Sequence, residues 1–318
     1  MTIKSLKKKY SSNINPADLD LLLEFVLKKP REFLITHPEY NLSIIQQLRL
    51  RYFIGQLKKH KPIDYIIRRK EFYGLDFKIT NHTLVPRPET EQMIDLASEI
   101  IFNNQRKNFT ILDIGTGSGN IIIALLKKMQ TTPLLRAEIQ SYASDISQKA
   151  LSVAKENALF HRLGIKFVKG NLLEPFNKLL TTQVTTPVIS GCCGNVSASC
   201  NKLSKENRQS KILLITANLP YLSTKIYNNS APKVKNYEPQ TALVSGNDGL
   251  NHYRKLLNQL QKIHLNKNFS FAKTYLLLEI SPEQKNKINK EIISRFPKAK
   301  ITFHKDLAQK WRMVEIKI

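Results

Sequence analysis

The chain has 318 residues, of which 42% are hydrophobic, and this length suffices for about two domains that each bury a core. No stretch approaches the roughly 18 uncharged apolar residues of a membrane helix, and the basic residues at 1–10 lead into no signal-peptide core. We therefore expect a cytoplasmic protein without a membrane partner. The net charge of +25 favours a polyanionic neighbour, such as nucleic acid or the ribosome, but equally suits compositional drift in a chain rich in Lys, Ile and Asn.

The cysteines exclude a disulfide framework. Cys192, Cys193 and Cys200 lie within nine residues of each other, and the rest of the chain has none. A zinc site would need a fourth ligand at a recognisable spacing, and no His lies in that segment. We expect no metal.

The first part of the chain predicts a small helical unit. Asn15 and Pro16 form a helix start, and apolar residues recur behind them at helical spacing. A short helix is expected over 30–34 and a longer one over 43–59. The expected apolar face of the longer helix consists of Ile44, Leu48, Tyr52 and Leu57.

A change of apolar period after residue 70 indicates strands. Residues 75–79 alternate as a strand, Asn81 and His82 suit a turn, and 83–85 return, which predicts a hairpin between two domains. The hairpin leads into Pro-Arg-Pro-Glu-Thr-Glu at 86–91, where the prolines fix the chain and a helix can start.

The most specific chemical pattern follows a predicted strand that ends at Asp113. Gly115, Gly117 and Gly119 come next, and an apolar helix starts after them. Glycines let the backbone approach a ligand, and a helix start offers free N–H groups. The spacing differs from the dinucleotide-binding pattern, so a pyrophosphate is not the expected ligand. The next predicted strand ends at Asp145, whose carboxylate can accept both hydroxyls of a ribose.

The remainder of the chain continues to alternate between strands and helices, which predicts a mostly parallel sheet. A helix is expected over 148–161 and a strand over 165–168. Residues 181–210 have no helical or strand period, so we expect a disordered surface insertion there. Further strands are expected over 274–280, 301–304 and 313–318.

A buried strand over 211–217 is predicted to present Asn218, Leu219, Pro220 and Tyr221. The Asn218 amide can accept and donate hydrogen bonds, the proline stiffens the turn, and the aromatic ring can cover a flat group. Taken alone, the same four residues suit an ordinary turn after a strand.

Together these motifs resemble the HemK-type protein-glutamine N5-methyltransferases, which methylate the glutamine of the Gly-Gly-Gln motif in peptide chain release factors. The resemblance rests on Glu71-Phe-Tyr-Gly74, Pro86-Arg-Pro-Glu-Thr-Glu91, Asp113-Ile-Gly-Thr-Gly-Ser-Gly119, Asn218-x-Pro220-Tyr221, Glu238-Pro239, Asp248-Gly-Leu250 with Tyr253-Arg254, and Leu278-Glu-Ile280. It implies an α/β fold of the class I S-adenosylmethionine-dependent methyltransferases, with a Rossmann-like seven-stranded sheet. The implied parts are a helical substrate-binding domain at 1–70, a β-hairpin linker at 71–88 and a methyltransferase domain at 89–318.

The resemblance also implies roles for individual residues. Gly115, Thr116, Gly117, Ser118 and Gly119 would hold the amino acid part of S-adenosylmethionine, and Asp145 its ribose. The other residues expected in this cofactor pocket are Arg87, Glu89, Asn171, Leu172 and Asn218, with Asn171 and Leu172 beside the adenine. The Asn218 side-chain oxygen and the Leu219 carbonyl would accept the two N–H bonds of the substrate amide. Pro220 completes this catalytic motif, and Tyr221 would pack on the amide.

Four features depart from the family pattern. Leu219 stands where the family has a first proline, Asn171 where an acidic residue is common, and Gln309 where a glycine is usual. The insertion at 181–210 replaces a short connection.

Two alternative functions remain open at this point. Asn-Leu-Pro-Tyr also occurs in ribosomal RNA adenine N6-methyltransferases, and the basic charge would suit them, but they lack the N-terminal helical domain and the Pro-Arg-Pro-Glu-Thr-Glu element. The other alternative is an inactive homologue that still binds release factors or ribosomes. The resemblance itself implies a monomer that acts on release factors near the ribosome and has no nucleic acid substrate.

Overall fold

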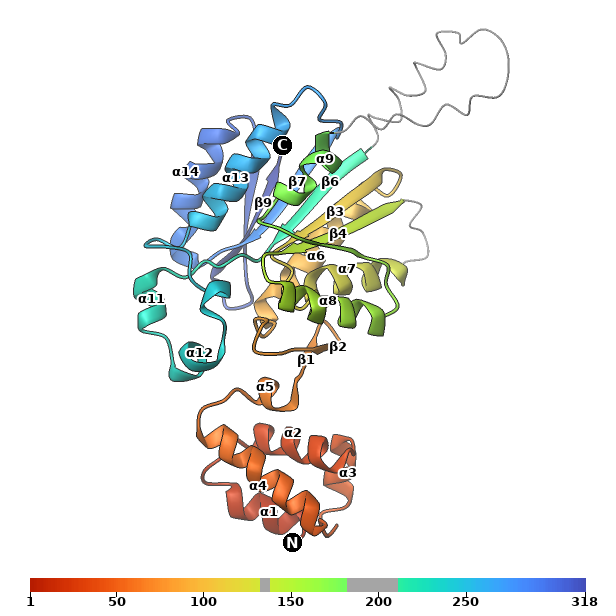
Figure 1. Ribbon diagram of the computed structural model, residues 1–318, viewed down its shortest axis with the longest axis vertical. Coiled ribbons are helices and arrows are strands. Elements are labelled where there is room, and N and C mark those ends of the chain that lie inside the picture. The colour runs from red at the N-terminus through yellow and green to blue at the C-terminus, as the bar shows by residue number, and fades with distance from the viewer. Residues whose placement is uncertain (132–137, 182–210) are drawn as a thin grey trace, which may run out of the picture.

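The structure, a computed structural model, describes residues 1–131, 138–181 and 211–318 (Figure 1). The first five helices form a separate lobe. They are α1 (Ile3–Tyr10), α2 (Pro16–Leu27), α3 (Arg31–Thr36), α4 (Ile44–Lys58) and α5 (Ile63–Ile67). The sequence does not predict helix α1, because its only two buried residues stand among lysines and give no clear apolar period. Ile3 and Leu6, one helical turn apart, are both buried in the core of the lobe.

Helix α4 differs from the expected amphipathic helix. Its buried residues are Leu50 and Ile54, and Leu57 packs against the same core. The remaining residues of the expected apolar face point to solvent: Ile44, Leu48 and Tyr52 are 77%, 58% and 63% exposed. Three of the four residues of the expected apolar face therefore do not cover the core, and they give the lobe an exposed apolar surface.

The predicted hairpin exists and its strand over 75–79 is confirmed as β2 (Leu75–Lys78), but the partner strand lies before it and not after it. Strand β1 (Arg69–Phe72) pairs with β2, and residues 83–85 form no strand. Tyr73 and Gly74 both have positive φ, at 54° and 69°, which is the geometry of the tight two-residue turns that join twisted strands. A two-residue turn at this point fixes the pairing of the strands before it and after it.

The second lobe contains a seven-stranded sheet in the order β5-β4-β3-β6-β7-β9-β8. The strands β3 to β7 are mutually parallel, and β9 is antiparallel to both β7 and β8. Their bounds are β3 (Asn108–Ile114), β4 (Ile139–Asp145), β5 (Lys166–Lys169), β6 (Lys211–Ala217), β7 (Lys273–Glu279), β8 (Lys300–Lys305) and β9 (Trp311–Lys317).

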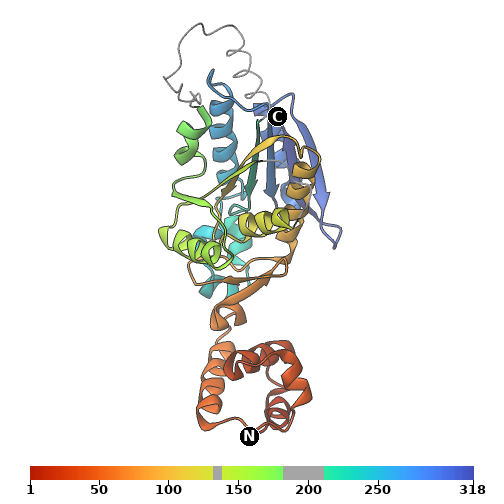
Figure 2. The ribbon, with the colours of Figure 1, turned by 90° about the vertical axis from the view of Figure 1, so that its right-hand side faces the viewer.

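Helices cover both faces of this sheet (Figure 2). In β6, Leu213 and Ile215 face α13 and α14, whereas Ile212 and Leu214 face α6 and α7 on the opposite side. Burial on both faces explains why β6 is continuously apolar from Ile212 to Ile215. The bounds are α6 (Glu91–Phe102), α7 (Asn120–Gln130), α8 (Gln148–Phe160), α9 (Asn177–Thr181), α11 (Thr224–Asn228), α12 (Pro232–Tyr237), α13 (Asn251–His264) and α14 (Lys285–Arg295).

The mostly parallel sheet, the helices on both its faces, the N-terminal helices and the hairpin confirm the predicted fold class. Of the predicted insertion at 181–210, Thr181 is the last residue of α9, and 182–210 lie outside the described residues. Within the described part of the chain, no helix is long and apolar enough to cross a bilayer.

A buried asparagine connects the hairpin to the second lobe. The Asn157 side chain in α8 accepts from the Lys78 backbone N–H at 2.8 Å and donates to the carbonyls of Lys78, at 2.9 Å, and Ser118, at 2.8 Å. Asn157 therefore joins β2, α8 and the glycine loop after β3, and it satisfies three backbone groups that would otherwise be unpaired.

We expect Asn157→Ala to lower the free energy of unfolding by at least about 2 kcal/mol, because buried polar groups lose their partners. Glu156→Ala is the matched control, since it removes only the exposed ion pair with Lys78 and should cost less than about 1 kcal/mol. Urea unfolding followed by the fluorescence of Trp311, the single tryptophan, measures both variants. Equal losses would show that Asn157 does not hold the hairpin.

Candidate active site

The register of the parallel strands brings five residues to one edge of the sheet. Ile114 pairs with Ser144 and with Ala217, Asp145 with Lys169, and Ala217 with Leu278. The residues at or just beyond these carboxyl ends therefore form a row. In sheet order they are Gly170, Asp145, Gly115, Asn218 and Glu279. In open α/β sheets this edge is where ligands bind.

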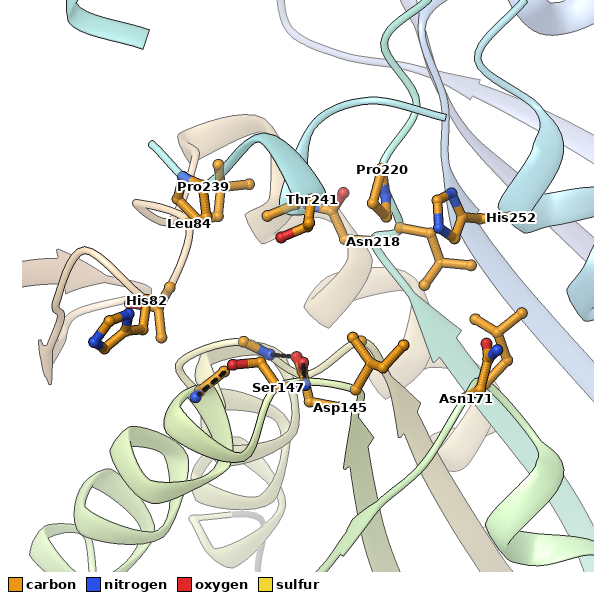
Figure 3. A pocket seen from close by; sticks show the side chains of 18 of the residues that line it. His82, Leu84, Asp145, Ser147, Asn171, Asn218, Pro220, Pro239, Thr241 and His252 are labelled. Carbon is orange, nitrogen blue, oxygen red and sulfur yellow. Dashed lines mark hydrogen bonds between the residues drawn. The ribbon is translucent and has the colours of Figure 1, made fainter. Parts of the chain in front are cut away.

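A cavity of about 250 Å³ lies over this row (Figure 3). Asp145 and Ser147 lie on one side of the cavity, and Asn218, Pro220 and Thr241 on the other. Of the residues predicted for the site, those that line the cavity are Gly115, Gly117, Asp145, Asn171, Leu172, Asn218, Leu219 and Pro220. The structure thus brings together four segments that lie apart in the sequence.

The glycine loop needs glycines for two different reasons. Gly115 and Gly117 have φ values of 72° and 57°, a region that L side chains rarely adopt. A Cβ on Gly115 would lie 2.9 Å from the Leu219 Cδ2 atom, whereas a Cβ on Gly117 would meet no atom within 4 Å. Gly115 therefore allows close packing under the loop, and Gly117 leaves open space beside the cavity.

Asp113 holds this loop from below and does not line the cavity. Its carboxylate accepts hydrogen bonds from the Thr116 hydroxyl at 2.6 Å and the Thr216 hydroxyl at 2.9 Å. Burial raises the pKa of Asp113 to about 6, against the opposing effect of the two hydroxyls. Asp113 thereby ties the end of β3 to the loop and to β6, the strand that presents Asn218.

Asp145 is fixed by its own backbone surroundings. One carboxylate oxygen accepts from the Gly117 N–H at 2.9 Å and the other from the Ser147 N–H at 2.8 Å (Figure 3). Burial raises the pKa of Asp145, and these backbone donors oppose the increase. Each oxygen keeps a second lone pair, so the carboxylate can still accept two hydroxyl groups.

Gln259 in α13 holds the loop after β5. Its side chain accepts from the Leu173 N–H at 2.9 Å and lies 3.4 Å from the Asn171 carbonyl, to which it donates. Leu172 has a φ of 57° and is almost fully buried. The pair Asn171 and Leu172 is therefore held at the cavity wall by a residue from another helix.

The four residues after β6 point in different directions. Asn218 lines the cavity and donates through Nδ2 to the Thr90 hydroxyl at 3.1 Å. Leu219 is buried in the core, and its carbonyl lies 3.4 Å from the Tyr253 hydroxyl. Pro220 lines the cavity, whereas the Tyr221 hydroxyl donates to Glu279 at 3.3 Å.

Six predicted site residues are not among the residues that line the cavity: Arg87, Glu89, Thr116, Ser118, Gly119 and Tyr221. The Arg87 guanidinium is instead directed to the buried Glu238 carboxylate, at 2.7 and 2.6 Å. Glu89 is exposed, and Thr116 and Ser118 are buried behind the loop. At Gly119 a Cβ would lie 3.3 Å from the Cβ of Ala154, so this glycine lets α8 pack closely. The ring of Tyr221 packs with the core.

Other cavity residues carry no signal in the sequence: His82, Thr83, Leu84, Thr241, Ala242 and His252. The sequence predicts a hairpin turn at His82 and a strand at Leu84, and neither prediction points to a place in the cavity. His252 lies on α13 without a distinctive pattern. Its Nδ1 atom is 2.7 Å from the Ser245 hydroxyl, and burial together with the charge of Lys255 lowers its pKa. Ser147, by contrast, follows a strand end and could have been found by the same rule as Asp145.

Family models and relatives agree with this geometry. Residues 105–234 match the model of a methyltransferase domain, which is the class that the sheet and the cavity define. Residues 2–67 match the model of the PrmC N-terminal domain.

The relatives are named release factor glutamine methyltransferase. The one from Clostridium botulinum is 32% identical over 310 residues, covering 97% of this chain and 94% of the relative. The one from Dictyoglomus turgidum is 31% identical, covering 95% and 93%, and the one from Flavobacterium psychrophilum is 30% identical, covering 93% and 89%. The chain belongs to the release factor glutamine methyltransferase family.

The contact between Gly115 and Leu219 gives a testable difference between two glycines. We expect Gly117→Ala to cost about 1–2 kcal/mol through its backbone conformation alone. Gly115→Ala should cost more, because its Cβ also meets Leu219. In a Leu219→Ala background the difference between the two variants should shrink. Urea unfolding midpoints of all combinations test this. Equal costs of Gly115→Ala and Gly117→Ala in the protein that retains Leu219 would contradict the contact.

Proposed function

We propose that this chain transfers a methyl group from S-adenosylmethionine to the side-chain amide nitrogen of the glutamine in the Gly-Gly-Gln motif of release factors. The observation that carries the proposal is the position of Asn218. Its side chain lines the cavity beside the glycine loop, and its NH₂ group is engaged by Thr90. The side-chain oxygen is then available as an acceptor for an amide substrate. Membership of the release factor glutamine methyltransferase family supports this substrate. Because release factors act in translation, we place the reaction in the cytoplasm.

The cavity residues fit S-adenosylmethionine. Asp145 keeps one acceptor site on each oxygen, which suits the two hydroxyls of a ribose. Gly117 leaves open space for the close approach of a ligand to the backbone. Asn171 and Leu172 would border the adenine, and Gly115 and Gly117 the amino acid part. When bound, this cofactor supplies a methyl group on a sulfonium sulfur, which is a good leaving group.

The protein's task in the reaction is to orient a poor nucleophile. The lone pair of an amide nitrogen is delocalised, so it must be held in line with the methyl group. Asn218 Oδ1 and the Leu219 carbonyl would each accept one N–H of the substrate amide. These acceptors also stabilise the positive charge that develops on nitrogen during transfer. The Leu219 carbonyl has two lone pairs and can bind substrate while it remains near the Tyr253 hydroxyl.

The exposed apolar face of α4 suits a protein substrate. Ile44, Ile45, Leu48 and Tyr52 form this α4 face, and each is more than half exposed. Contiguous exposed apolar surface marks interaction sites on soluble proteins. The helical lobe belongs to the matched N-terminal domain, so we propose that the α4 face binds the release factor outside its Gly-Gly-Gln loop.

We expect the wild-type chain to add one methyl group to the release factor glutamine, detected by mass spectrometry of the substrate. Asn218→Ala should lower kcat/KM by about 10²–10³, because an oriented acceptor is lost. Asn286→Ala, an exposed asparagine on α14, is the matched control and should leave the rate unchanged. Methyl groups found on ribosomal RNA would overturn the protein substrate. A chain that binds the release factor without methylating it would be an inactive homologue.

A second variant tests the α4 face. Leu48→Glu should raise KM for the intact release factor about tenfold, corresponding to about 1.4 kcal/mol of lost contact. It should leave the turnover of a short Gly-Gly-Gln peptide unchanged, since the peptide does not reach α4. Leu265→Glu, an equally drastic change at another exposed leucine, is the control. Equal KM values for Leu48→Glu and the control would exclude the α4 face.

A further inference from the structure

Two buried residues behind the cavity hold Asn218. Asn218 Nδ2 donates to Thr90 Oγ1 at 3.1 Å, and Thr90 Oγ1 donates to Glu279 Oε2 at 2.6 Å. Thr90 and Glu279 are each 1% exposed, and neither lines the cavity. The Asn218 amide is thus hydrogen-bonded to the Thr90 hydroxyl, and this hydroxyl is hydrogen-bonded to the Glu279 carboxylate.

Elements distant in sequence meet at this point. Ala217 pairs with Leu278 between β6 and β7, so the next residues, Asn218 and Glu279, are neighbours across the sheet. Thr90 ends the short helix Pro88–Thr90, which follows the hairpin. The prolines that fix this segment therefore place the hydroxyl between the amide and the carboxylate.

The direction of the hydrogen bonds is set by the carboxylate. An ionised carboxylate can only accept, so the Thr90 hydroxyl hydrogen must point to Glu279. The hydroxyl oxygen can then only accept from Asn218, which selects the NH₂ group of the amide. The opposite flip of Asn218 would place its oxygen against the lone pairs of Thr90 and turn the NH₂ group toward the substrate.

We propose that Glu279 and Thr90 are positioning residues, which select the amide orientation in which Asn218 Oδ1 faces the substrate. This inference rests on the proposed function, because only a substrate with N–H groups needs an acceptor here. It assigns a role to a buried acid that the chemistry of methyl transfer does not otherwise use.

The surroundings of Glu279 make this orientation sensitive to pH. Burial raises the pKa of Glu279 to about 7, opposed by Thr90, Arg312 and Tyr221 and assisted by the charge of Glu89. The Tyr221 hydroxyl donates to Oε1, and the Tyr253 hydroxyl donates to the Glu279 carbonyl. A protonated Glu279 can itself donate to Thr90, so the hydroxyl hydrogen is released and the amide orientation is no longer selected.

If Glu279 had only a structural role, Glu279→Gln would lose activity only together with stability. Its pKa in the folded state exceeds the ordinary value of 4.5, so the native state holds this proton more tightly than the unfolded chain. The resulting stability is complete below pH about 4.5 and is lost as the pH rises to about 7. Glu279→Gln removes this loss, so the variant should be at least as stable as the wild type at pH 8. A loss of activity in a variant with undiminished stability separates positioning from folding.

The kinetic test compares four full-length proteins from pH 6 to 9. Glu279→Gln and Thr90→Val should each lower kcat at pH 8 by on the order of a hundredfold, while the Kd for S-adenosylhomocysteine changes little. Thr90→Ser keeps the hydroxyl and should stay within about threefold of the wild type. The wild-type kcat should fall below pH 7, and this fall should be absent in Glu279→Gln. An unchanged kcat in Thr90→Val, or a wild-type pH profile in Glu279→Gln, would overturn the proposal.

A spectroscopic readout separates this proposal from the proposed function. In asparagine-labelled protein, the Asn218 side-chain signals are identified by their absence in Asn218→Ala. They should shift with a midpoint near the Glu279 pKa of about 7 in the wild type, and the shift should be absent in Glu279→Gln and Thr90→Val. A pH-independent Asn218 signal in the wild type would refute the positioning role. A wild type that methylates no release factor would refute the function alone, since the titration is read without substrate.

Discussion

The site depends on the register of the parallel strands. Pairing of Ile114 with both Ser144 and Ala217, and of Ala217 with Leu278, aligns the carboxyl ends of four strands at one edge. In a sheet, a shift of one residue would turn every side chain to the opposite face, so the buried apolar faces maintain this alignment. Loops from separate parts of the chain then meet at this edge of the sheet.

Two buried acids use the same edge in different ways. Asp113 accepts from two hydroxyls and does not border the cavity, so it joins β3 to its loop and to β6. Glu279 accepts from the Thr90 hydroxyl, which itself accepts from the cavity residue Asn218, so the charge of Glu279 affects the hydrogen bond that Asn218 makes. Burial raises the pKa of both acids. The two acids therefore differ in their partners: those of Asp113 belong to the glycine loop and to β6, whereas Thr90, the partner of Glu279, contacts the cavity residue Asn218.

The sequence predicts the parts of this molecule that local pattern determines. The alternation of apolar strands and helices, the glycine loop and the strand-terminal Asp145 and Asn218 give the fold class and six of the cavity residues, and the family resemblance adds Asn171 and Leu172. The sequence does not predict features that depend on distant contacts or on an uncommon turn sequence. The hairpin turn at Tyr73 and Gly74 lacks the usual asparagine, the α4 apolar face has no core to cover, and Arg87 turns to a glutamate 151 residues away. The last two cannot be read from a window of neighbouring residues.

The departure at Leu219 shows how a local change is absorbed by packing. A proline at this position would restrict the turn through its ring, and leucine lacks that restriction. Here the leucine side chain is buried in the core and fills the space against Gly115, whose missing Cβ makes room for it. The carbonyl of the same residue is held near the Tyr253 hydroxyl. Side-chain burial and one polar contact thus hold a backbone that a proline would restrict through its ring, and they connect the Leu219 carbonyl to the glycine loop beside the cavity.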